Sequence, residues 1–333
     1  VESRRQTLPN VGERLATRFY EELGIATVSE LLDAAVSHRL QALRGIGSRK
    51  ELQILHSAQA AAPTPAPALT DVLRCPGCGH DGLGARSASV SCPVCERQYA
   101  VEHGVVDLAS PDVRTGRTVA RRLMETRFYA RFYEDVMRPR LTEVVSTRSM
   151  SEEYELATKY LKLEDARAVL DVACGTGNFT RHFARELRSK GHPSLLVAAD
   201  LSWPMLETAR TYLRAEKLEE QVHLLRADAT RFPLRSGAFD RLHCAGALHL
   251  MEDVDGALAE FARLLEPGGI CVIGTFVTGS GIWQRTLKRV AEIPSGFHWF
   301  GPDELPGRMA AHGLAVYQES VQGDALTVAA RRI

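Results

Sequence analysis

AVLDVACGTGNFT, residues 168–180, joins an apolar run that ends in an acid to a glycine turn and a helix start. The apolar lead predicts a buried strand, and Phe179, Phe183 and Leu187 recur at helical spacing after the turn. Glycine permits a positive φ and close approach of a ligand, and the amino terminus of a helix offers unpaired N–H groups. We therefore expect a ligand at this turn, in an α/β fold.

Three further strand patterns follow in order. Residues 195–200 (LLVAAD) predict a buried strand ending in an acid, residues 222–229 (VHLLRADA) a third strand, and residues 239–250 (FDRLHCAGALHL) a fourth. A glycine turn and a fifth strand come at residues 264–276, LLEPGGICVIGTF. Strands that alternate with helices indicate a doubly wound parallel sheet, and an acid ending the second strand is positioned to bind ribose hydroxyls.

These motifs, in this order, resemble class I S-adenosylmethionine-dependent methyltransferases over residues 150–333. The resemblance implies a seven-stranded, doubly wound, Rossmann-like sheet with an antiparallel edge strand. It implies that Gly175 and Gly177 lie against the methionine end of the cofactor, that Asp200 holds the ribose, and that Asp228 faces the adenine. Ala173 stands where many members have glycine. The implied cofactor-binding residues are Asp171, Ala173, Cys174, Gly175, Gly177, Asp200, Leu201, Met205, Asp228, Ala229 and Ala245.

Length and charge bound the remaining possibilities. The 333 residues carry 41 basic and 41 acidic side chains, so no net charge indicates a nucleic-acid or membrane partner. No stretch is apolar for the length of a membrane span, and no leader pattern is visible, so we expect a cytoplasmic protein. The expected parts are a helical module (1–57), an alanine- and proline-rich linker (58–68), a zinc ribbon (69–110), a helical cap (111–150) and a methyltransferase domain (151–333).

The first 57 residues read as short helices around two similar turns, at residues 8–12 and 43–47. They resemble paired helix-hairpin-helix units, in which main-chain N–H groups at a helix start hold a phosphate. Residues 1–56 hold eight basic against seven acidic side chains, a weak excess for a phosphate binder. Nucleic-acid binding and a small helical interaction module are therefore both open interpretations.

Four cysteines predict a metal site. Cys75 and Cys78 form one CxxC pair, Cys92 and Cys95 a second, with thirteen residues between the pairs. Four thiolates suit tetrahedral Zn²⁺ and leave no open position for water, so we expect structural zinc rather than disulfides. The ribbon resembles those of ribosomal-RNA guanine methyltransferases and also those preceding some quinone-biosynthesis methyltransferases.

Two histidines are the predicted catalytic residues. His249 leaves the fourth strand where a substrate would approach, and it could accept a proton or merely hydrogen-bond a loop carbonyl or the cofactor. His298 lies in the aromatic segment FHWF (297–300), which resembles an acceptor-pocket wall. A helical stretch at residues 115–147 carries Tyr129 and Tyr133 between arginines and is interpreted as a cap over the site, with RNA contact as the alternative.

The predicted function is S-adenosylmethionine-dependent methyl transfer to a small apolar or aromatic acceptor, at carbon or oxygen. The alternative is a ribosomal or transfer RNA base methyltransferase that uses the ribbon and the helical module for recognition. A third possibility is a non-enzymatic nucleic-acid adaptor on the same fold, which the intact Asp171, Gly175, Gly177, Asp200 and Asp228 disfavour.

Overall fold

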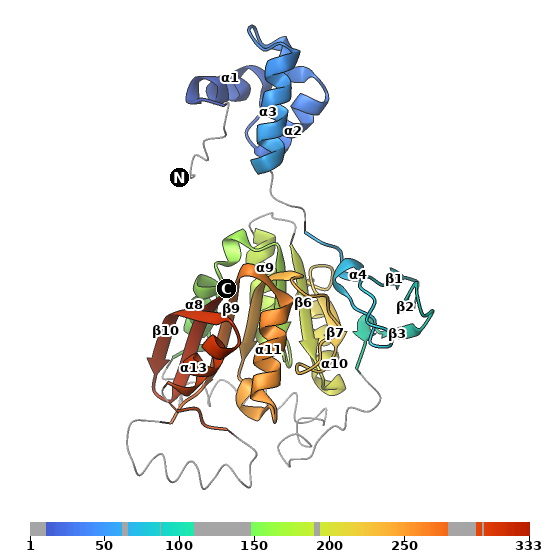
Figure 1. Cartoon of the computed structure of the whole chain (residues 1–333), viewed down its shortest axis with the longest axis vertical. Helices are drawn as coiled ribbons and strands as arrows, with labels where there is room; N and C mark the ends of the chain where they lie inside the picture. Colours follow the sequence, from blue (N-terminus) through green and yellow to red (C-terminus); the bar gives the residue numbers. More distant parts are fainter. Residues whose placement is uncertain are drawn as a thin grey trace. The chain divides into compact units, whose positions relative to one another are not determined.

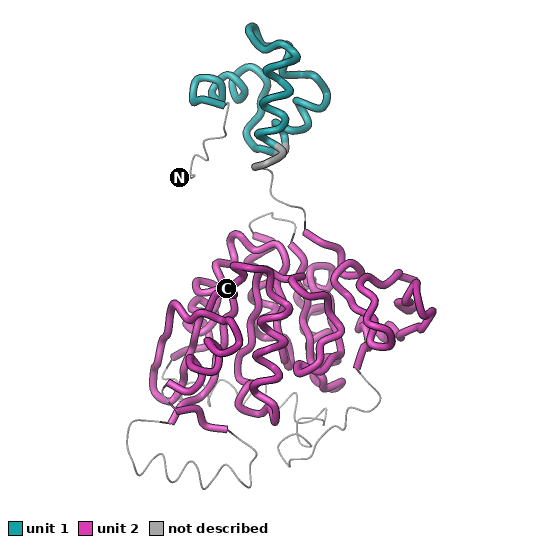
Figure 2. Tube along the Cα trace, viewed as in Figure 1, with its two compact units in different colours: residues 1–64 teal, residues 65–333 magenta. Residues whose placement is uncertain are grey.

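The computed structural model describes residues 11–61, 66–86, 88–109, 148–189, 194–278, 298–301 and 303–333. The chain divides into two compact units, residues 1–64 and residues 65–333 (Figure 2). The predicted helical cap at 115–147 and the first predicted hairpin at 8–12, apart from its last two residues, lie outside the described residues.

The first unit is helical, as its sequence predicts (Figure 1). Its elements are α1 (Glu13–Leu23), α2 (Val28–Val36), the 3-10 helix η1 (Arg39–Ala42) and α3 (Ser48–Ala61). Helix α2 begins with a capping box, in which the Thr27 hydroxyl accepts the Glu30 N–H and the Glu30 carboxylate accepts the Thr27 N–H.

Helix α3 runs four residues into the segment that was expected to be linker from residue 58 onward. Ala58 lies one helical turn after Ile54, and both side chains are fully buried in the core of this unit. The helix therefore continues because its apolar face still packs there, although the local composition is that of a linker.

The second unit begins with short elements around the cysteines. Helix α4 (Leu69–Val72) leads into β1 (Gly84–Ala85), β2 (Ser89–Ser91), β3 (Gln98–Glu102) and β4 (Val105–Asp107). Then come α8 (Met150–Leu161) and the 3-10 helix η3 (Leu163–Asp165).

The alternating part of the chain forms the body of this unit. Its elements are β5 (Ala168–Val172), α9 (Asn178–Ser189), β6 (Leu195–Asp200), α10 (Trp203–Ala215), β7 (His223–Arg226), β8 (Phe239–Ala245), η4 (Leu248–Leu250), α11 (Val254–Leu264), β9 (Leu265–Phe276), α13 (Glu304–Ala311), β10 (Leu314–Gln322) and β11 (Ala325–Arg332).

The described strands form one mixed sheet in the order β1-β2-β3-β4-β7-β6-β5-β8-β9-β11-β10. Strands β4, β7, β6, β5, β8 and β9 run parallel, and β11 is antiparallel to both of its neighbours. The Rossmann-like α/β class is confirmed. Two details differ from the prediction. The cysteine-rich strands extend the sheet to eleven described strands, and the antiparallel strand β11 lies inside the edge strand β10.

The cysteine-rich segment is therefore not a separate layer. Its strand β4 pairs with β7, and Leu73 bridges to Leu234. Val72, Val106 and Leu108 are buried in the same hydrophobic cluster as the central strands. The sequence indicated a ribbon in front of the methyltransferase sheet, whereas burial of these side chains joins the ribbon to it.

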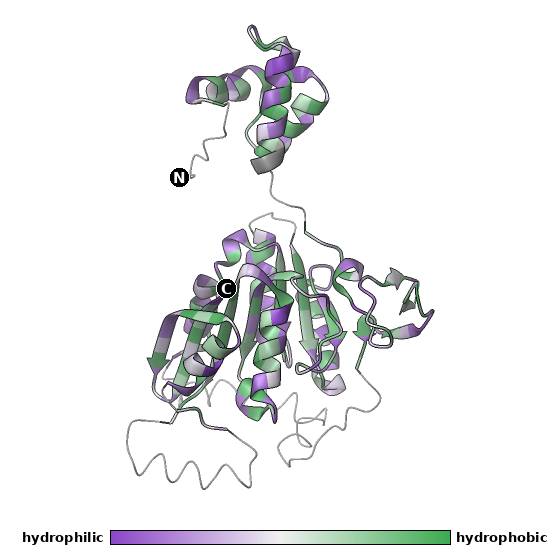
Figure 3. Ribbon diagram, in the orientation of Figure 1, coloured by the Kyte–Doolittle hydropathy of each residue, from purple (hydrophilic) through white to green (hydrophobic). Residues whose placement is uncertain are grey.

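Helices cover both faces of the sheet. Leu170 and Val172 of β5 pack in a cluster with α11 and α13, whereas Val169 packs on the opposite face with α8, α9 and α10. This alternation follows from the period of two in a strand. Hydrophobic residues are concentrated on the central strands, and the helices carry both kinds of residue (Figure 3). Among the described residues, no helix is long and apolar enough to cross a membrane.

Candidate active site

The carboxyl ends of the parallel strands carry the residues expected to bind the cofactor. Asp171 is the penultimate residue of β5, Asp200 ends β6, Asp228 follows β7, and Ala245 ends β8. Parallel strands place these ends at one edge of the sheet, where open α/β folds bind ligands. The structure therefore brings the predicted motifs together at a single edge.

The glycine turn after β5 has the positive φ values that its glycines predict. Gly175 and Gly177 have φ values of 56° and 81°, and Ala173 also has a positive φ, 51°. Ala173 thus occupies a left-handed conformation that glycine adopts without strain. A Cβ built on Gly175 would meet no atom within 4 Å, whereas one on Gly177 would lie 3.3 Å from the Cβ of Ala209. The turn is therefore open at Gly175 and packed against α10 at Gly177.

Asp171 lies near the end of β5, just before this turn. Its side chain is buried, and its two oxygens accept hydrogen bonds from the Thr180 hydroxyl and from Nδ1 of His243, the latter at 2.8 Å. The His243 ring packs between Phe179 and Phe183, with centroids 4.4 and 5.0 Å away. Asp171 therefore ties the end of β5 to the first turn of α9 and to β8. Sequence reasoning did not find the partner His243, because nothing local pairs positions on β5 and β8.

Asp200 joins the second strand to the glycine turn. Its Oδ2 accepts the Gly175 N–H at 2.8 Å, and its Oδ1 accepts the Ser202 N–H at 2.8 Å. The Leu201 N–H also bonds this carboxylate. A carboxylate offers about four lone pairs, so Asp200 can still accept a ribose hydroxyl beside these N–H groups. Burial raises the pKa of Asp200, although the N–H groups of Ser202 and Gly175 act in the opposite direction.

The third strand ends in a similar local arrangement. Oδ1 of Asp228 accepts both the N–H and the hydroxyl of Thr230, each at 2.9 Å, and the Ala227 N–H donates to the carbonyl of Asp200 at 3.1 Å. Ala229 is half-buried beside it, and Met205 is buried at the start of α10. These contacts hold the ends of β6 and β7 together.

The two predicted catalytic histidines lie next to each other beyond β8 and β9. The His298 N–H donates to the His249 carbonyl at 2.8 Å, and the His249 ring meets Phe276 edge-on at 4.8 Å. Trp299 lies 6.0 Å from Phe276, centroid to centroid, and Nε2 of His298 is 2.8 Å from Oε1 of Glu304. This aromatic cluster contains the described part of the FHWF segment; Phe297 lies outside the described residues.

His249 is 3% exposed, and burial lowers its pKa to about 3. Its Nδ1 lies 3.4 Å from the Thr275 hydroxyl. The imidazole is therefore neutral at physiological pH and is a weak proton acceptor. Of the two roles considered for His249, hydrogen bonding fits this environment better than general base catalysis.

The four ribbon cysteines converge. Their Sγ atoms all lie within 4.8 Å of one another, with 3.6 Å between Cys75 and Cys95 and 3.5 Å between Cys78 and Cys92. The N–H groups of Val94 and Cys95 point at Sγ of Cys92, at 3.4 and 3.5 Å. Four convergent sulfurs with knuckle N–H groups fit a tetrahedral Zn²⁺ ion.

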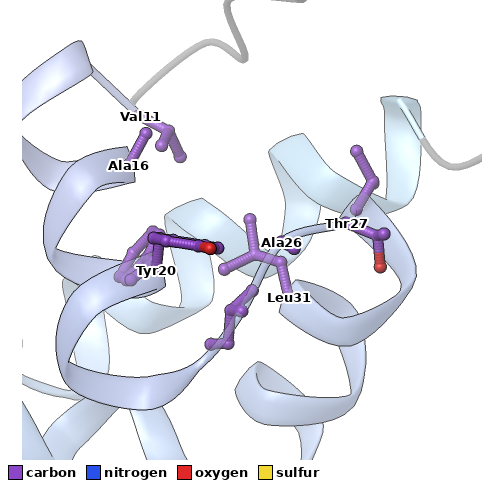
Figure 4. Close-up of a pocket in the computed structure, with 9 residues that line it drawn as sticks. Val11, Ala16, Tyr20, Ala26, Thr27 and Leu31 are labelled. Carbon is purple, nitrogen blue, oxygen red and sulfur yellow. The ribbon is translucent and has the colours of Figure 1, made fainter. Parts of the chain in front are cut away.

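The helical unit contains a cavity of about 340 Å³ (Figure 4). Among the described residues of this unit, no charged side chain lines the cavity; the lining residues are Val11, Ala16, Phe19, Tyr20, Ile25, Ala26, Thr27, Val28 and Leu31. Such a lining offers a phosphate no cationic partner.

Comparison with known proteins decides the family. Residues 169–269 match the family model described as "Methyltransferase domain", and residues 6–60 match "SAM-like Helix-hairpin-helix tandem". An uncharacterized chloroplastic methyltransferase of Arabidopsis thaliana, At1g78140, is 31% identical over 284 residues, which cover 78% of this chain and 79% of that protein. The chain belongs to the methyltransferase family. A demethylmenaquinone methyltransferase of Thermus thermophilus is 38% identical to this methyltransferase over 183 residues, 48% of this chain and 80% of that protein.

Three predictions are thereby confirmed for the methyltransferase: its enzyme class, its S-adenosylmethionine cofactor and its helix-hairpin-helix unit. The Arabidopsis relative is described as a chloroplastic protein. A cytoplasmic location of the methyltransferase stays a prediction.

Proposed function

We propose that this chain transfers the methyl group of S-adenosylmethionine to a small apolar or aromatic acceptor, at carbon or oxygen. The observation that carries the proposal is the aromatic cluster of His249, Phe276, His298 and Trp299 at the ends of β8 and β9. A flat apolar ring would pack against such side chains. The Thermus relative, a demethylmenaquinone methyltransferase, supports an acceptor of this class.

The cofactor supplies an electrophilic methyl group when it is bound. The chain must chiefly hold the acceptor in line with that group, and positioning alone contributes several kcal/mol to such rates. A thiolate nucleophile is not part of the proposal, because Cys244 and Cys271 are fully buried and burial raises the pKa of both thiols. His249 and His298 then form part of the wall of the acceptor pocket, and they orient the acceptor by hydrogen bonding.

For the cofactor we propose contacts along the carboxyl edge of the sheet. The open space beside Gly175 admits the methionine part, and the free lone pairs of Asp200 accept the ribose hydroxyls. Asp228 and Ala229 lie at the next strand end, where the adenine would follow. Asp171 would act indirectly, by fixing the start of α9 through its bond from Thr180. The rest of the proposed set is Ala173, Cys174, Gly177, Leu201, Met205 and Ala245.

We further propose one structural zinc ion bound by Cys75, Cys78, Cys92 and Cys95. Cys75 and Cys92 are buried in the hydrophobic cluster of the main sheet, so this ion would stabilise the ribbon where it joins the sheet. The RNA alternative finds no support in the relatives named above, and we do not propose it.

The test is to incubate the purified protein with methyl-labelled S-adenosylmethionine in two parallel reactions. One contains a lipid-soluble extract and the other contains total RNA. We expect label in an aromatic, lipid-soluble product. The variant Trp299→Ala should lose most of this methyl transfer while retaining cofactor affinity. The control is Tyr317→Ala, which removes a half-exposed aromatic side chain from the edge strand β10 and should retain the methyl transfer. Label in RNA alone would overturn the proposal.

A further inference from the structure

We propose that Asp107 and Arg226 are positioning residues for the cofactor site, through which the cysteine-rich segment shapes the loop that follows Asp200. This inference rests on the proposed role of Asp200 and Leu201 as cofactor contacts. It gives the ribbon a role within the cofactor site of this chain.

The backbone places the two residues side by side. Strand β4, the last strand of the cysteine-rich segment, runs parallel to β7, with Val105 opposite Leu224 and Asp107 opposite Arg226. The Leu108 N–H donates to the Arg226 carbonyl at 3.0 Å and continues the ladder by one residue. Asp107 therefore arrives at the same carboxyl edge at which β6 and β7 end.

The Arg226 side chain connects the ribbon to the cofactor loop. Its Nη1 donates to Oδ2 of Asp107 at 3.0 Å, and its Nε donates to the Leu201 carbonyl at 3.0 Å. Leu201 directly follows Asp200, whose carboxylate holds the N–H groups of Gly175 and Ser202. One guanidinium thus fixes the peptide beside the carboxylate that we assign to the ribose.

Asp107 is itself held in place. Its other oxygen, Oδ1, accepts the Ala109 N–H at 3.1 Å. The Asp107 and Arg226 side chains are each 26% exposed, so the ion pair by itself contributes little to global stability. Its effect is orientation, because the planar guanidinium can donate to Asp107 and to Leu201 together only in one pose.

This geometry predicts how substitutions of Asp107 and Arg226 should change the affinity for S-adenosylhomocysteine. Asp107→Ala frees the guanidinium and should weaken S-adenosylhomocysteine binding about three- to tenfold, as expected for coupled contacts. Asp107→Asn keeps an acceptor oxygen and should restore part of the affinity. Arg226→Lys keeps the charge but replaces the planar fork with a point donor, so it should bind the ligand as weakly as Arg226→Met.

The experiment is titration calorimetry with S-adenosylhomocysteine on the full, metal-loaded chain. The matched control is Asp81→Ala, which removes an exposed carboxylate of the same segment, 3.6 Å from Arg74, and should leave the affinity unchanged. The double variant Asp107→Ala/Arg226→Met should bind like Arg226→Met alone, because the two residues act through one contact. Additive losses, or wild-type affinity in Asp107→Ala, would overturn the inference. A lower melting temperature with unchanged affinity would also overturn it, because it would indicate a purely structural role.

Asp200→Ala separates this inference from the proposed cofactor site. We expect it to weaken binding at least about tenfold, because charge-assisted bonds to the ribose hydroxyls are lost. If Asp200→Ala binds normally, the proposed cofactor contacts are wrong. If Asp200→Ala loses affinity and Asp107→Ala does not, the contacts stand and only the positioning role fails.

Discussion

At the scale of single residues, the buried imidazole of His249 should make the free energy of unfolding depend on pH. Burial lowers its folded pKa to about 3 from 6.5, so the unfolded chain takes up a proton below pH 6.5 while the folded chain does not. The contribution of neutral His249 to the free energy of unfolding is therefore fully present above pH 6.5. It is lost as the pH falls from 6.5 toward 3. Between pH 7 and pH 5 we expect a loss of about 2 kcal/mol from this residue.

Urea unfolding at pH 7 and pH 5 measures this loss. Glutamine cannot titrate, so in His249→Gln the free energy of unfolding should differ between pH 7 and pH 5 by about 2 kcal/mol less than in the wild type. His103→Gln, at an exposed histidine in the turn between β3 and β4, is the control and should leave the difference as in the wild type. Equal pH dependence of wild type and His249→Gln would contradict the assigned environment of His249.

Ala173 offers a second prediction at this scale. Its φ of 51° costs an alanine about 1–2 kcal/mol, whereas glycine loses roughly 0.5–1 kcal/mol in chain entropy. Ala173→Gly should therefore raise the free energy of unfolding by about 0.5–1 kcal/mol, measured by urea unfolding. Ala184→Gly, at a buried position inside α9, should lower it. A destabilised Ala173→Gly protein would show that the positive φ is not strained.

At the scale of elements, the cysteine-rich segment should depend on its metal. We expect one zinc per chain by elemental analysis, and loss of that zinc in Cys92→Ser, because folding and binding free energies are shared in small metal sites. Amide exchange should then increase in β1 to β3 before it increases in β5 or β6. Cys271→Ser, at a buried cysteine of β9, should keep the zinc. Zinc-free protein prepared without chelators would reject the site.

At the scale of the whole molecule, the two units should separate in function. All the residues proposed to bind cofactor or acceptor come from the unit of residues 65–333, and the core of the helical unit consists of its own residues. Methyl transfer needs an acceptor aligned within a fraction of an ångström, which rigidly attached groups provide. Deleting residues 1–64 should therefore leave turnover of a small acceptor within about twofold of the full chain.

The measurement is the rate of label transfer to the lipid-soluble product by the full chain and by residues 65–333. Trp299→Ala in either background should cost far more than the deletion. Transfer that disappears with residues 1–64 and falls steeply with salt would instead point to a nucleic-acid acceptor read by the helical unit.

The sequence by itself determined the elements and the order of the motifs. Apolar periodicity, glycine turns and strand-ending acids are local patterns, so they predicted β5, the turn around Gly175, the acid at Asp200 and the four convergent cysteines. The resemblance built on those motifs correctly gave the family and its cofactor. Helix ends were less well predicted, because α3 continues for as long as its buried face does.

The tertiary structure alone decided which distant positions meet. His243 bonds Asp171 across 72 residues, and Arg226 bonds Asp107 across 119. Tertiary structure also decided that the ribbon joins the main sheet and that β11 lies between β9 and the edge strand β10. Strand pairing and register depend on long-range burial and on hydrogen bonds between strands, and no local pattern in a single sequence encodes them.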